Sequence, residues 1–410
     1  MDRFFLELGR SVLTRWKERN FSLADFPEIA RDALERHPPA RNVDLATLLQ
    51  GFLLDDEQAF QTQSGFGEPE LVVYDDPRFY IQVLFWLDGT TDIHQHTFSG
   101  AFHVMAGSSI HSLFDFADSQ AVSAHLSVGN LRLKETRLLQ TGATVPIVSG
   151  RGYIHSLFHL DTPSLTVVIR THNDPGSGPQ FTYLPPHFAV DPFYNDALTV
   201  RRKQLLDVLE KTADSSYAEL TLAMVGHLDF ERGFYILQNG MGHLRRLGRW
   251  EATLEVFQRK HGAQSNYVEP TLDEIVRRDG LVSLRSSFTD TEHRFFLALL
   301  LNVSGRDVIL NLVSQRVSGD PIETILRWTE ELTVLTDDST WILDAQFPET
   351  VNVSLERQSA CFVDALSHFL RGGLGPVACD SVSLPSEDLE QLYDAFANSS
   401  FRALMPVRIP

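Results

Sequence analysis

Residues 92–107, DIHQHTFSGAFHVMAG, contain the pattern that decides the fold. His94 and His96 are separated by one residue, and an alternating apolar run follows them and ends at Gly107. In a β-strand, residues i and i+2 point to the same face, so the two imidazoles are directed toward one place. Imidazole is a good ligand for iron, zinc, copper and nickel. The stretch therefore predicts a strand that carries two ligands of a metal site.

A second segment offers a third ligand, which the site needs because two imidazoles alone hold a metal weakly. Residues 146–159, PIVSGRGYIHSLFH, contain a glycine turn whose last residue, Gly152, lies three residues before His155. The apolar residues around His155 indicate a further strand. His155 is therefore the candidate third ligand.

The composition limits the class of protein. The chain has 410 residues, of which 43% are hydrophobic, so it is long enough for two domains with buried cores. Its formal net charge of −19 repels phosphate backbones, and we expect no nucleic-acid partner. Only two cysteines occur, Cys361 and Cys379, which argues against a disulfide framework and indicates a cytoplasmic location. The N-terminus is typical of an amphipathic helix rather than a signal peptide, and no apolar run is long enough to predict a membrane partner.

The chain changes character twice along its length. Its first part has apolar residues at helical intervals. Short stretches rich in Val, Ile, Phe, Tyr and Thr follow and are typical of an antiparallel sandwich or barrel. The apolar residues then return to three- and four-residue steps. The pattern predicts an α+β multidomain fold: N-terminal helices packed on a barrel in residues 1–69, a β-barrel with the metal site in 70–190, and a mostly α-helical domain in 198–410.

The first histidine segment resembles the first metal motif of the cupin superfamily. That motif has His-x-His, then usually a Glu, and ends in a Gly. Here it reads His94, His96, Gly100 and Gly107, so a glycine stands in the place of the glutamate.

The second segment resembles the second cupin motif, Pro-x-Gly-x-x-His followed by an Asn. Here it reads Pro146, a longer glycine turn, His155, and His159 in the position of the Asn. Together the two motifs imply a double-stranded cupin β-barrel. The missing glutamate implies a three-histidine metal site formed by His94, His96 and His155.

Within the superfamily, the chain is similar to the thiol dioxygenases, the cysteine dioxygenase family. Residues 79–116 follow that family's first motif, and the similarity covers about residues 20–185. The second half of the chain is not recognised. The resemblance implies one Fe(II) ion per chain on three neutral histidines, a thiolate and the co-substrate O2 beside it, and a sulfinic acid product.

Three departures from the family pattern concern the substrate. Ala101 occupies the position of a cysteine that some members crosslink to a tyrosine. Thr166, Val168 and Arg170 stand where the family has Ser, His and Tyr. The arginine that pairs with the substrate carboxylate in the family has no counterpart before the first barrel strand. We therefore do not expect free cysteine to be the substrate.

The strands beside the metal motifs supply the candidate pocket residues. Alternation directs every second side chain of residues 79–86 toward the pocket, and the family alignment places a face of residues 164–171 in the barrel lumen. The candidate substrate-binding residues are Tyr80, Gln82, Leu84, Trp86, Thr166, Val168 and Arg170. The candidate catalytic residues are Arg170, His103 and Tyr153.

Several of these assignments have a structural alternative. Arg170 would bind a carboxylate of the substrate from inside the lumen, or would reach solvent from the strand end. His103 would line the pocket as a proton shuttle, or would be a hydrogen-bonded core histidine. Tyr153 lies two residues from His155 and is expected to face the site. His159 is expected beside the ligands or at the surface rather than as a fourth ligand.

The leading interpretation is a cytoplasmic non-haem Fe(II) dioxygenase of the thiol dioxygenase-like cupin type. Its substrate would be a thiol or another metal-chelating molecule, either small or bound to a carrier. The helical domain would then bind the substrate or a protein partner, or would mediate dimerisation. Two alternatives stay open: a metal-dependent cupin lyase, isomerase or hydrolase, and a non-enzymatic, ligand-sensing cupin whose helical domain binds a partner.

Overall fold

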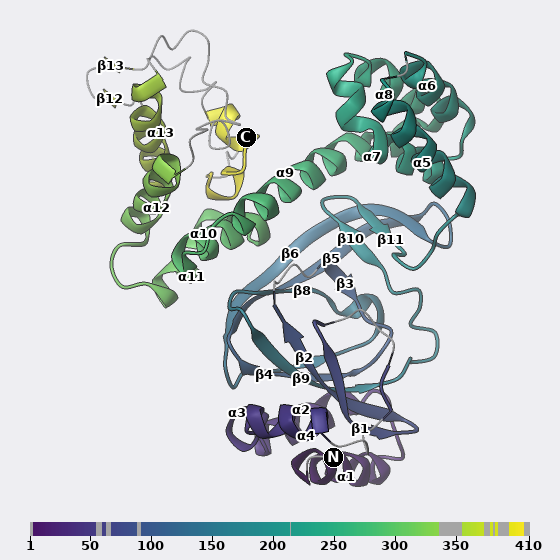
Figure 1. The fold of residues 1–410 in the computed structure, drawn as a ribbon, viewed down its shortest axis with the longest axis vertical. Coiled ribbons are helices and arrows are strands. Elements are labelled where there is room, and N and C mark those ends of the chain that lie inside the picture. Colours follow the sequence, from purple (N-terminus) through teal and green to yellow (C-terminus); the bar gives the residue numbers. More distant parts are fainter. Residues whose placement is uncertain are drawn as a thin grey trace.

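The structure is a computed structural model, and it describes residues 3–54, 60–62, 67–87, 92–213, 215–335, 355–372, 378–379, 382–383 and 393–405. Helices at the N-terminus lie against one end of a β-barrel, and a largely helical region follows the barrel (Figure 1). This arrangement confirms the predicted fold class. The predicted helical range 198–410 also includes residues that lie outside the described ones, among them 336–354.

The described residues before the barrel form four helices: α1 (Arg3–Glu18), α2 (Phe26–Arg36), α3 (Pro39–Asn42) and α4 (Leu45–Leu54). The apolar residues of α1 recur at steps of three and four, so they share one face of the helix. That face, with Phe5 and Val12, is buried against Phe79 and Ile81 of the barrel. Burial of this face holds the N-terminal helices on the outside of the sheet.

The barrel consists of two antiparallel sheets, with strand orders β1-β2-β9-β4-β7 and β10-β11-β6-β5-β8-β3. The first contains β1 (Glu70–Asp76), β2 (Phe79–Trp86), β4 (Gly100–Ala106), β7 (Thr144–Ile147) and β9 (Ser164–Thr171). The second contains β3 (Ile93–Gln95), β5 (Ser108–Ala121), β6 (Leu126–Gln140), β8 (Ile154–His159), β10 (Thr182–Leu184) and β11 (Phe188–Val190). Because β10 also pairs with β3, the second sheet closes on itself.

The two faces of the first sheet have different roles. Phe79, Ile81 and Val83 of β2 belong to the core under the N-terminal helices. Leu84 and Trp86, on the alternate face of β2, belong to a separate core inside the barrel. Leu84 pairs with Thr166 of β9 in the strand register, so these two side chains share the inner face. Strand alternation thus determines which residues surround the interior.

The hairpin of β5 and β6 is longer than the short strands that the sequence predicts. It extends from the barrel to a group of helices, α5 (Ala197–Lys211), α6 (Tyr217–His227), α7 (Phe230–Arg246) and α8 (Trp250–His261) (Figure 1). Leu126 and Val128 of β6 share a buried core with Phe230 and Phe234 of α7. The far end of the hairpin is therefore stabilised by the helical region.

A long helix, α9 (Val268–Ser286), leads from this group to α10 (Thr291–Asn302), α11 (Arg306–Arg316), α12 (Pro321–Leu335) and α13 (Leu355–Leu370) (Figure 1). The core of this second helical group includes Phe296 and Trp328, and it also includes Ile110 and Phe158 of the barrel. The helices therefore pack directly on the strands. The only strands described after the barrel are two short ones, β12 (Ala378–Cys379) and β13 (Val382–Ser383).

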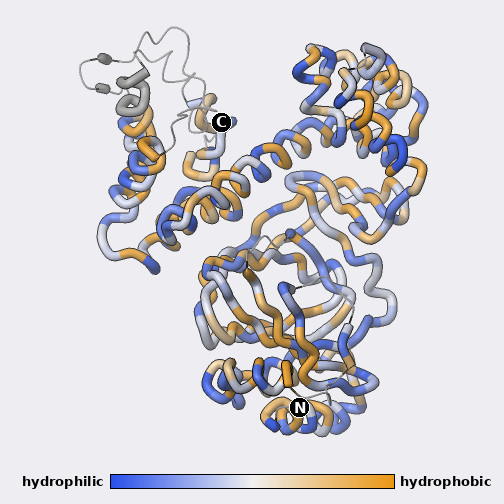
Figure 2. The backbone as a smooth tube through the Cα atoms, in the orientation of Figure 1, coloured by the Kyte–Doolittle hydropathy of each residue, from blue (hydrophilic) through white to orange (hydrophobic). Residues whose placement is uncertain are grey.

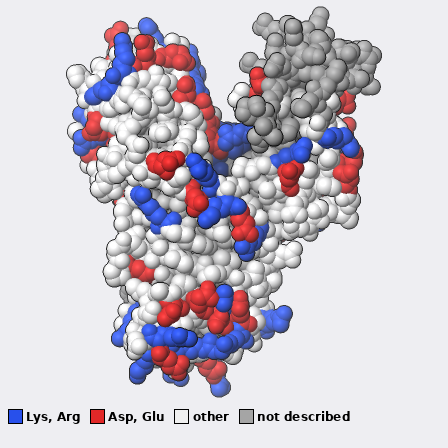
Figure 3. All heavy atoms as spheres, turned by 180° about the vertical axis from the view of Figure 1, so that it is seen from behind, with Lys and Arg blue, Asp and Glu red and all other residues white. Residues whose placement is uncertain are grey.

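Acidic and basic side chains are intermixed on the surface of the molecule. Figure 2 shows hydrophobic and hydrophilic segments alternating along the helices. On the face seen in Figure 3, basic and acidic side chains lie next to one another over the N-terminal helices. Within the described ranges, no helix combines the length and the apolar character that crossing a membrane requires.

Candidate metal centre

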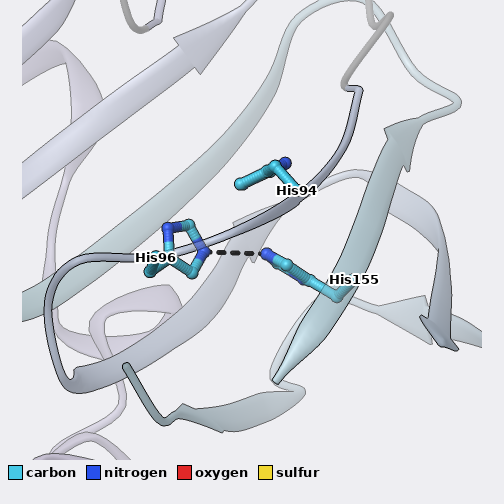
Figure 4. Close-up of side chains that lie close together, drawn as sticks. All are labelled: His94, His96 and His155. Atoms are coloured by element: carbon cyan, nitrogen blue, oxygen red, sulfur yellow. Dashed lines mark hydrogen bonds between the residues drawn. The ribbon is translucent and has the colours of Figure 1, made fainter. Parts of the chain in front are cut away.

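Three histidines meet inside the barrel. His94 of β3 and His155 of β8 are partners in the strand register, and His96 directly follows β3. One ring nitrogen of each histidine lies within 4.8 Å of the other two. Figure 4 shows the three rings gathered at one place, with Nε2 of His96 and Nε2 of His155 separated by 2.8 Å.

Two glycines explain how the histidine segments are positioned. The backbone N–H of Gly150 donates to the carbonyl oxygen of His96 at 2.7 Å, and Gly150 has a φ of +78°, a value that favours glycine. A Cβ atom at Gly100 would overlap the carbonyl oxygen of Ile169. The position where the cupin motif usually has glutamate therefore has no room for a side chain, and no carboxylate reaches the histidines from it.

The three imidazoles are buried, which sets their protonation state. Burial lowers the pKa of His94, and it lowers the pKa values of His96 and His155 well below the usual range, with neighbouring imidazoles adding to the effect on these two. At neutral pH all three rings are therefore uncharged. A neutral imidazole is the form that binds a metal ion.

Hydrogen bonds orient two of the rings. Nδ1 of His94 lies 2.7 Å from the carbonyl oxygen of Asp92, and because a carbonyl only accepts, Nδ1 carries the proton. The Nε2 atom of His94 is then unprotonated and can act as a metal ligand. Nδ1 of His155 lies 3.2 Å from Nε2 of His111, which also lies 3.1 Å from the hydroxyl of Tyr153. If His155 is likewise protonated on Nδ1, its Nε2 lone pair faces His96.

The residues fit a divalent transition metal. Two Nε2 lone pairs that face each other at 2.8 Å repel unless a proton or a metal cation lies beside them. Within the described ranges, His94, His96 and His155 form the one group of potential metal-binding side chains, and it contains only nitrogen ligands. An all-imidazole site suits iron, zinc, copper or nickel better than magnesium or calcium, which prefer oxygen.

A small cavity of about 40 Å³ lies beside the histidines. Five of the predicted substrate-binding residues line it: Gln82, Leu84, Trp86, Thr166 and Val168. Four apolar residues that the sequence reasoning missed complete the wall: Phe98, Phe102, Ile147 and Leu157. A wall of mostly apolar side chains excludes water from a ligand that binds at the three imidazole rings.

Gln82 is the exceptional polar residue of this wall. It is 1% exposed, and its Oε1 atom has no hydrogen-bond partner among the residues that the structure describes. Thr166, by contrast, accepts a hydrogen bond of 3.1 Å from Nε1 of Trp86. A buried amide oxygen without a partner costs free energy in the absence of a ligand. Gln82 therefore offers a hydrogen-bonding group to a molecule in the cavity.

Arg170 and Tyr80 lie beyond the cavity wall. The guanidinium carbon of Arg170 is 3.5 Å from the ring centre of Phe98 and 5.1 Å from that of Tyr80. Its Nε and Nη2 atoms donate to the carbonyl oxygens of Thr171 and His172, each at 3.3 Å. Phe98 also packs on His96, with ring centres 4.3 Å apart. Arg170 is thus one aromatic ring away from the metal ligands, at the rim of the cavity.

The structure separates the other predicted residues. His103 lies on β4 and its Nδ1 is 2.8 Å from Oγ1 of Thr144, but it does not line the cavity. The neighbouring inner residue Phe102 lines it instead. Tyr153 packs on His155 with ring centres 4.7 Å apart, and its hydroxyl lies 3.1 Å from Nε2 of His111. His159 stacks on Trp86 with ring centres 4.5 Å apart, behind the cavity wall.

His111 is the polar residue that sequence reasoning did not assign to the site. It is paired with Leu157 of β8, and Leu157 lines the cavity. The alternation in SSIHSLFDF, residues 108–116, contains the signal, because Ile110 and His111 must face opposite sides of the strand. Ile110 lies in the core that the barrel shares with the second helical group, so His111 points to the interior of the barrel.

Comparisons with known proteins identify no specific family for this chain. No family model and no curated protein matches the chain. Among solved structures, hydroquinone 1,2-dioxygenase from Sphingomonas sp. TTNP3 is 13% identical, with 26% of this chain and 67% of that chain covered and a TM-score of 0.20. An RmlC-like cupin from Shewanella frigidimarina NCIMB 400 is 12% identical, with 28% and 90% covered and a TM-score of 0.18. KdgF from Halomonas sp. is 16% identical, with 29% and 91% covered and a TM-score of 0.19.

These similarities reach less than a third of the chain and concern the fold alone. Together, the fold and the site define a cupin-like barrel with a buried cluster of three histidines.

Proposed function

We propose that the protein is a non-haem Fe(II) dioxygenase that converts a small thiol, other than free cysteine, into a sulfinic acid. The observation that supports this most directly is the set of ligands, three buried neutral imidazoles without a carboxylate. Fe(II) on neutral ligands keeps its two positive charges, which favours an anionic thiolate beside it. When bound, the iron would supply the electron route between the sulfur and O2.

The proposed reaction is balanced without an external reductant. A thiolate, R–S⁻, and O2 give a sulfinate, R–SO2⁻, so both oxygen atoms end on sulfur. Sulfur loses the four electrons that O2 gains. A thiol first loses its proton to solvent as its sulfur enters the site. From the thiolate onward the net reaction takes up and releases no proton, so the oxygenation itself needs no general acid or base, in agreement with a cavity wall that has no carboxylate.

Each part of the cavity has a role in this proposal. His94, His96 and His155 would hold the ion, and His111 would orient His155 through its Nδ1 atom. The apolar wall excludes water and orients the substrate. The amide of Gln82 would accept a hydrogen bond from a hydroxyl, amide or ammonium group of the substrate.

The volume of the cavity bears on the size of the substrate. About 40 Å³ has room for the reactive end of a small molecule and little more. We therefore favour a small-molecule thiol. A carrier-bound thiol would have to bring its sulfur into the same volume, and a protein partner of the helical region stays a separate proposal.

Oxygen uptake tests the proposal. The purified chain is stripped of metal with a chelator and reloaded anaerobically with Fe(II), or with Zn(II) as the matched redox-inactive control. Oxygen consumption is then followed with 2-mercaptoethanol, cysteamine, 3-mercaptopropionate and cysteine. We expect the iron-loaded protein to consume O2 with at least one of the first three thiols, to prefer it to cysteine, and to form its sulfinate as identified by mass spectrometry.

Two results would contradict the proposal. If the iron-loaded protein binds these thiols but never consumes O2, the site belongs to a metal-dependent cupin of another reaction class. If the protein does not bind a metal ion in a stoichiometric amount, the barrel is a ligand-sensing domain instead. The His94→Ala, His96→Ala double variant controls for free iron, and it should be inactive under the same loading.

A further inference from the structure

A second cavity, of about 570 Å³, lies where the helical region meets the barrel. One side is formed by α9 and by the segment after α10, and the other by strands β3, β5 and β6. It shares no lining residue with the cavity beside the three histidines. Its size is that of a pocket for a small organic molecule. Neither the metal site nor the proposed reaction uses it.

Three arginines and one glutamate form the charged wall of this cavity: Arg277, Arg278, Arg402 and Glu274. Arg277 is fully engaged, since Nε and Nη2 donate to Glu274 at 2.7 and 2.9 Å and Nη1 donates to the carbonyl oxygen of Leu300 at 3.1 Å. Arg402 shares the same carboxylate, with Nη2 at 2.5 Å from Oε2. One carboxylate therefore serves two guanidinium groups.

Arg278 has no such partner. Its Nη1 atom donates to the carbonyl oxygen of Leu301 at 2.8 Å, and no carboxylate in the described part of the chain forms an ion pair with it. Burial lowers the pKa of both Arg278 and Arg402. The wall thus carries two positive charges more than negative ones, in a chain whose formal net charge is −19. Glu274 and Asp92 act on Arg278 only from a distance. A partly buried guanidinium group with no carboxylate in direct contact favours the binding of an anion.

The opposite wall is apolar. Ile93, Phe114, Leu131, Leu133 and Pro185 of the barrel face the arginines across the cavity, and Met405 closes it from the C-terminal side. Such a combination suits a molecule with an anionic head and a hydrocarbon body. The head would reach the free N–H groups of Arg278, and the body would lie on the strands.

We propose that this cavity binds a small organic anion, a carboxylate or a phosphate monoester that carries an apolar group. Guanidinium groups bind both head groups through paired hydrogen bonds, so the charged wall alone does not choose between them. The site lies behind β3, the strand that carries His94, because Ile93 faces this cavity while His94 faces the other. The helical region would thereby supply the charged half of a ligand site, and the barrel would supply only its apolar half.

Isothermal titration calorimetry on the full chain tests the proposal with three probes of equal chain length: octanoate, monooctyl phosphate and 1-octanol. We expect one molar equivalent of at least one anion to bind about tenfold or more tightly than the uncharged alcohol. The anion that binds more tightly identifies the head group. Equal or weaker binding of both anions relative to 1-octanol would overturn the proposal.

Variants locate the binding. Arg278→Met should weaken the preferred anion about tenfold or more and leave 1-octanol unchanged, and Arg278→Lys should restore part of the loss because it keeps the charge but not the planar donor pair. Arg259→Met, at an exposed arginine of α8, is the matched control and should bind like the wild type. The His94→Ala, His96→Ala variant should also keep the site. Unchanged anion affinity in Arg278→Met would overturn the assignment. A thermal unfolding transition for each variant shows that it is folded. If Arg278→Met does not fold, the anion affinity of Arg278→Lys is the test.

Discussion

His111 and His155 face each other inside the barrel, with Nε2 of His111 3.2 Å from Nδ1 of His155. The same nitrogen of His111 lies 3.1 Å from the hydroxyl of Tyr153. His155 has two ring nitrogens, and the one that His111 contacts is not the one that faces His96. His111 therefore determines which nitrogen of His155 is available to a metal. Tyr153 contacts both rings, since its hydroxyl lies beside His111 and its own ring packs on His155 with ring centres 4.7 Å apart.

Replacing His111 by phenylalanine should weaken metal binding about 10- to 100-fold, because partners of a ligand's second nitrogen typically contribute this much to affinity. The measurement is a competition titration of Co(II) or Zn(II) against a chelator. His103→Phe is the matched control, since His103 is an equally buried histidine that does not line the cavity. Equal losses in both variants would show that His111 supports the barrel rather than the ligand.

The wild-type chain should bind about one divalent metal ion, and the His94→Ala, His96→Ala variant should bind none at the site. One imidazole, that of His155, is too weak a ligand set to retain a metal through gel filtration. Metal content measured by inductively coupled plasma mass spectrometry checks this. Circular dichroism should show an unchanged fold, because the barrel is held by its apolar cores. A variant that retains a full equivalent of metal would place the ion elsewhere.

Local spacing predicts the strands of the barrel and places His94 and His96 on one face, and the resemblance to the second cupin motif adds His155 to the cluster. Alternation on β2 directs Gln82, Leu84 and Trp86 toward the interior, and all three line the cavity. Alternation does not indicate how many residues of a strand line the cavity. Tyr80 continues the same alternation as Gln82 but lies beyond the wall, next to Arg170.

His103 illustrates a second limit of sequence reasoning. Almost every residue of β4 is buried, so polarity does not reveal which face looks inward. Phe102 turned out to line the cavity and Ala101 to lie under the N-terminal helices, and His103 shares the face of Ala101. The pairing of β10 with β3 and the packing of Phe158 on the helices also escape prediction, since they join residues far apart in the sequence.

Gln82→Met should abolish discrimination between two thiols of equal size, on the assumption of the proposed function. 2-Mercaptoethanol offers a hydroxyl to the unpartnered amide oxygen of Gln82, and 1-propanethiol has a methyl group in its place. We expect the metal-loaded wild type to bind 2-mercaptoethanol about tenfold more tightly, the effect of one buried hydrogen bond of roughly 1–1.5 kcal/mol. Spectral titration of the Co(II) form measures both affinities. If both thiols bind but the ratio is unchanged in the variant, Gln82 does not read the substrate; if neither binds, the proposed function itself fails.

His159 should make the barrel sensitive to acid. Burial lowers the pKa of His159 from 6.5 to about 3, so below pH 6.5 the unfolded chain binds a proton that the folded chain does not. Stability is therefore lost as the pH falls from 6.5 toward 3, at about 1.4 kcal/mol per pH unit for this one group.

His159→Gln should reduce the slope of the unfolding free energy against pH by about that amount between pH 6 and 4. Urea unfolding of the metal-free protein at a series of pH values measures the slope without a contribution from metal release. His227→Gln, at an exposed position of α6, controls for the loss of an imidazole from the surface. A slope that stays the same in His159→Gln would mean that this side chain is protonated inside the fold.

Arg170 should determine whether the proposed enzyme accepts an anionic thiol. Its guanidinium lies on Phe98 at the rim of the cavity, and its Nε and Nη2 atoms are held by the carbonyl oxygens of Thr171 and His172. The other amino group, Nη1, makes no hydrogen bond with a described residue. A substrate that enters past Phe98 with a carboxylate at its far end would meet this group before its sulfur reached the histidines.

The test compares 3-mercaptopropionate with its neutral analogue 3-mercaptopropanamide at fixed iron content. A charge-assisted contact is worth on the order of 2–3 kcal/mol, so Arg170→Met should lower kcat/KM for the carboxylate about 30- to 150-fold and barely affect the amide. Arg170→Lys should recover only part of the loss, because an ammonium group lacks the planar pair of donors and cannot lie flat on Phe98. Equal changes for the two thiols in Arg170→Met would mean that Arg170 supports the position of Phe98 and has no direct contact with the substrate.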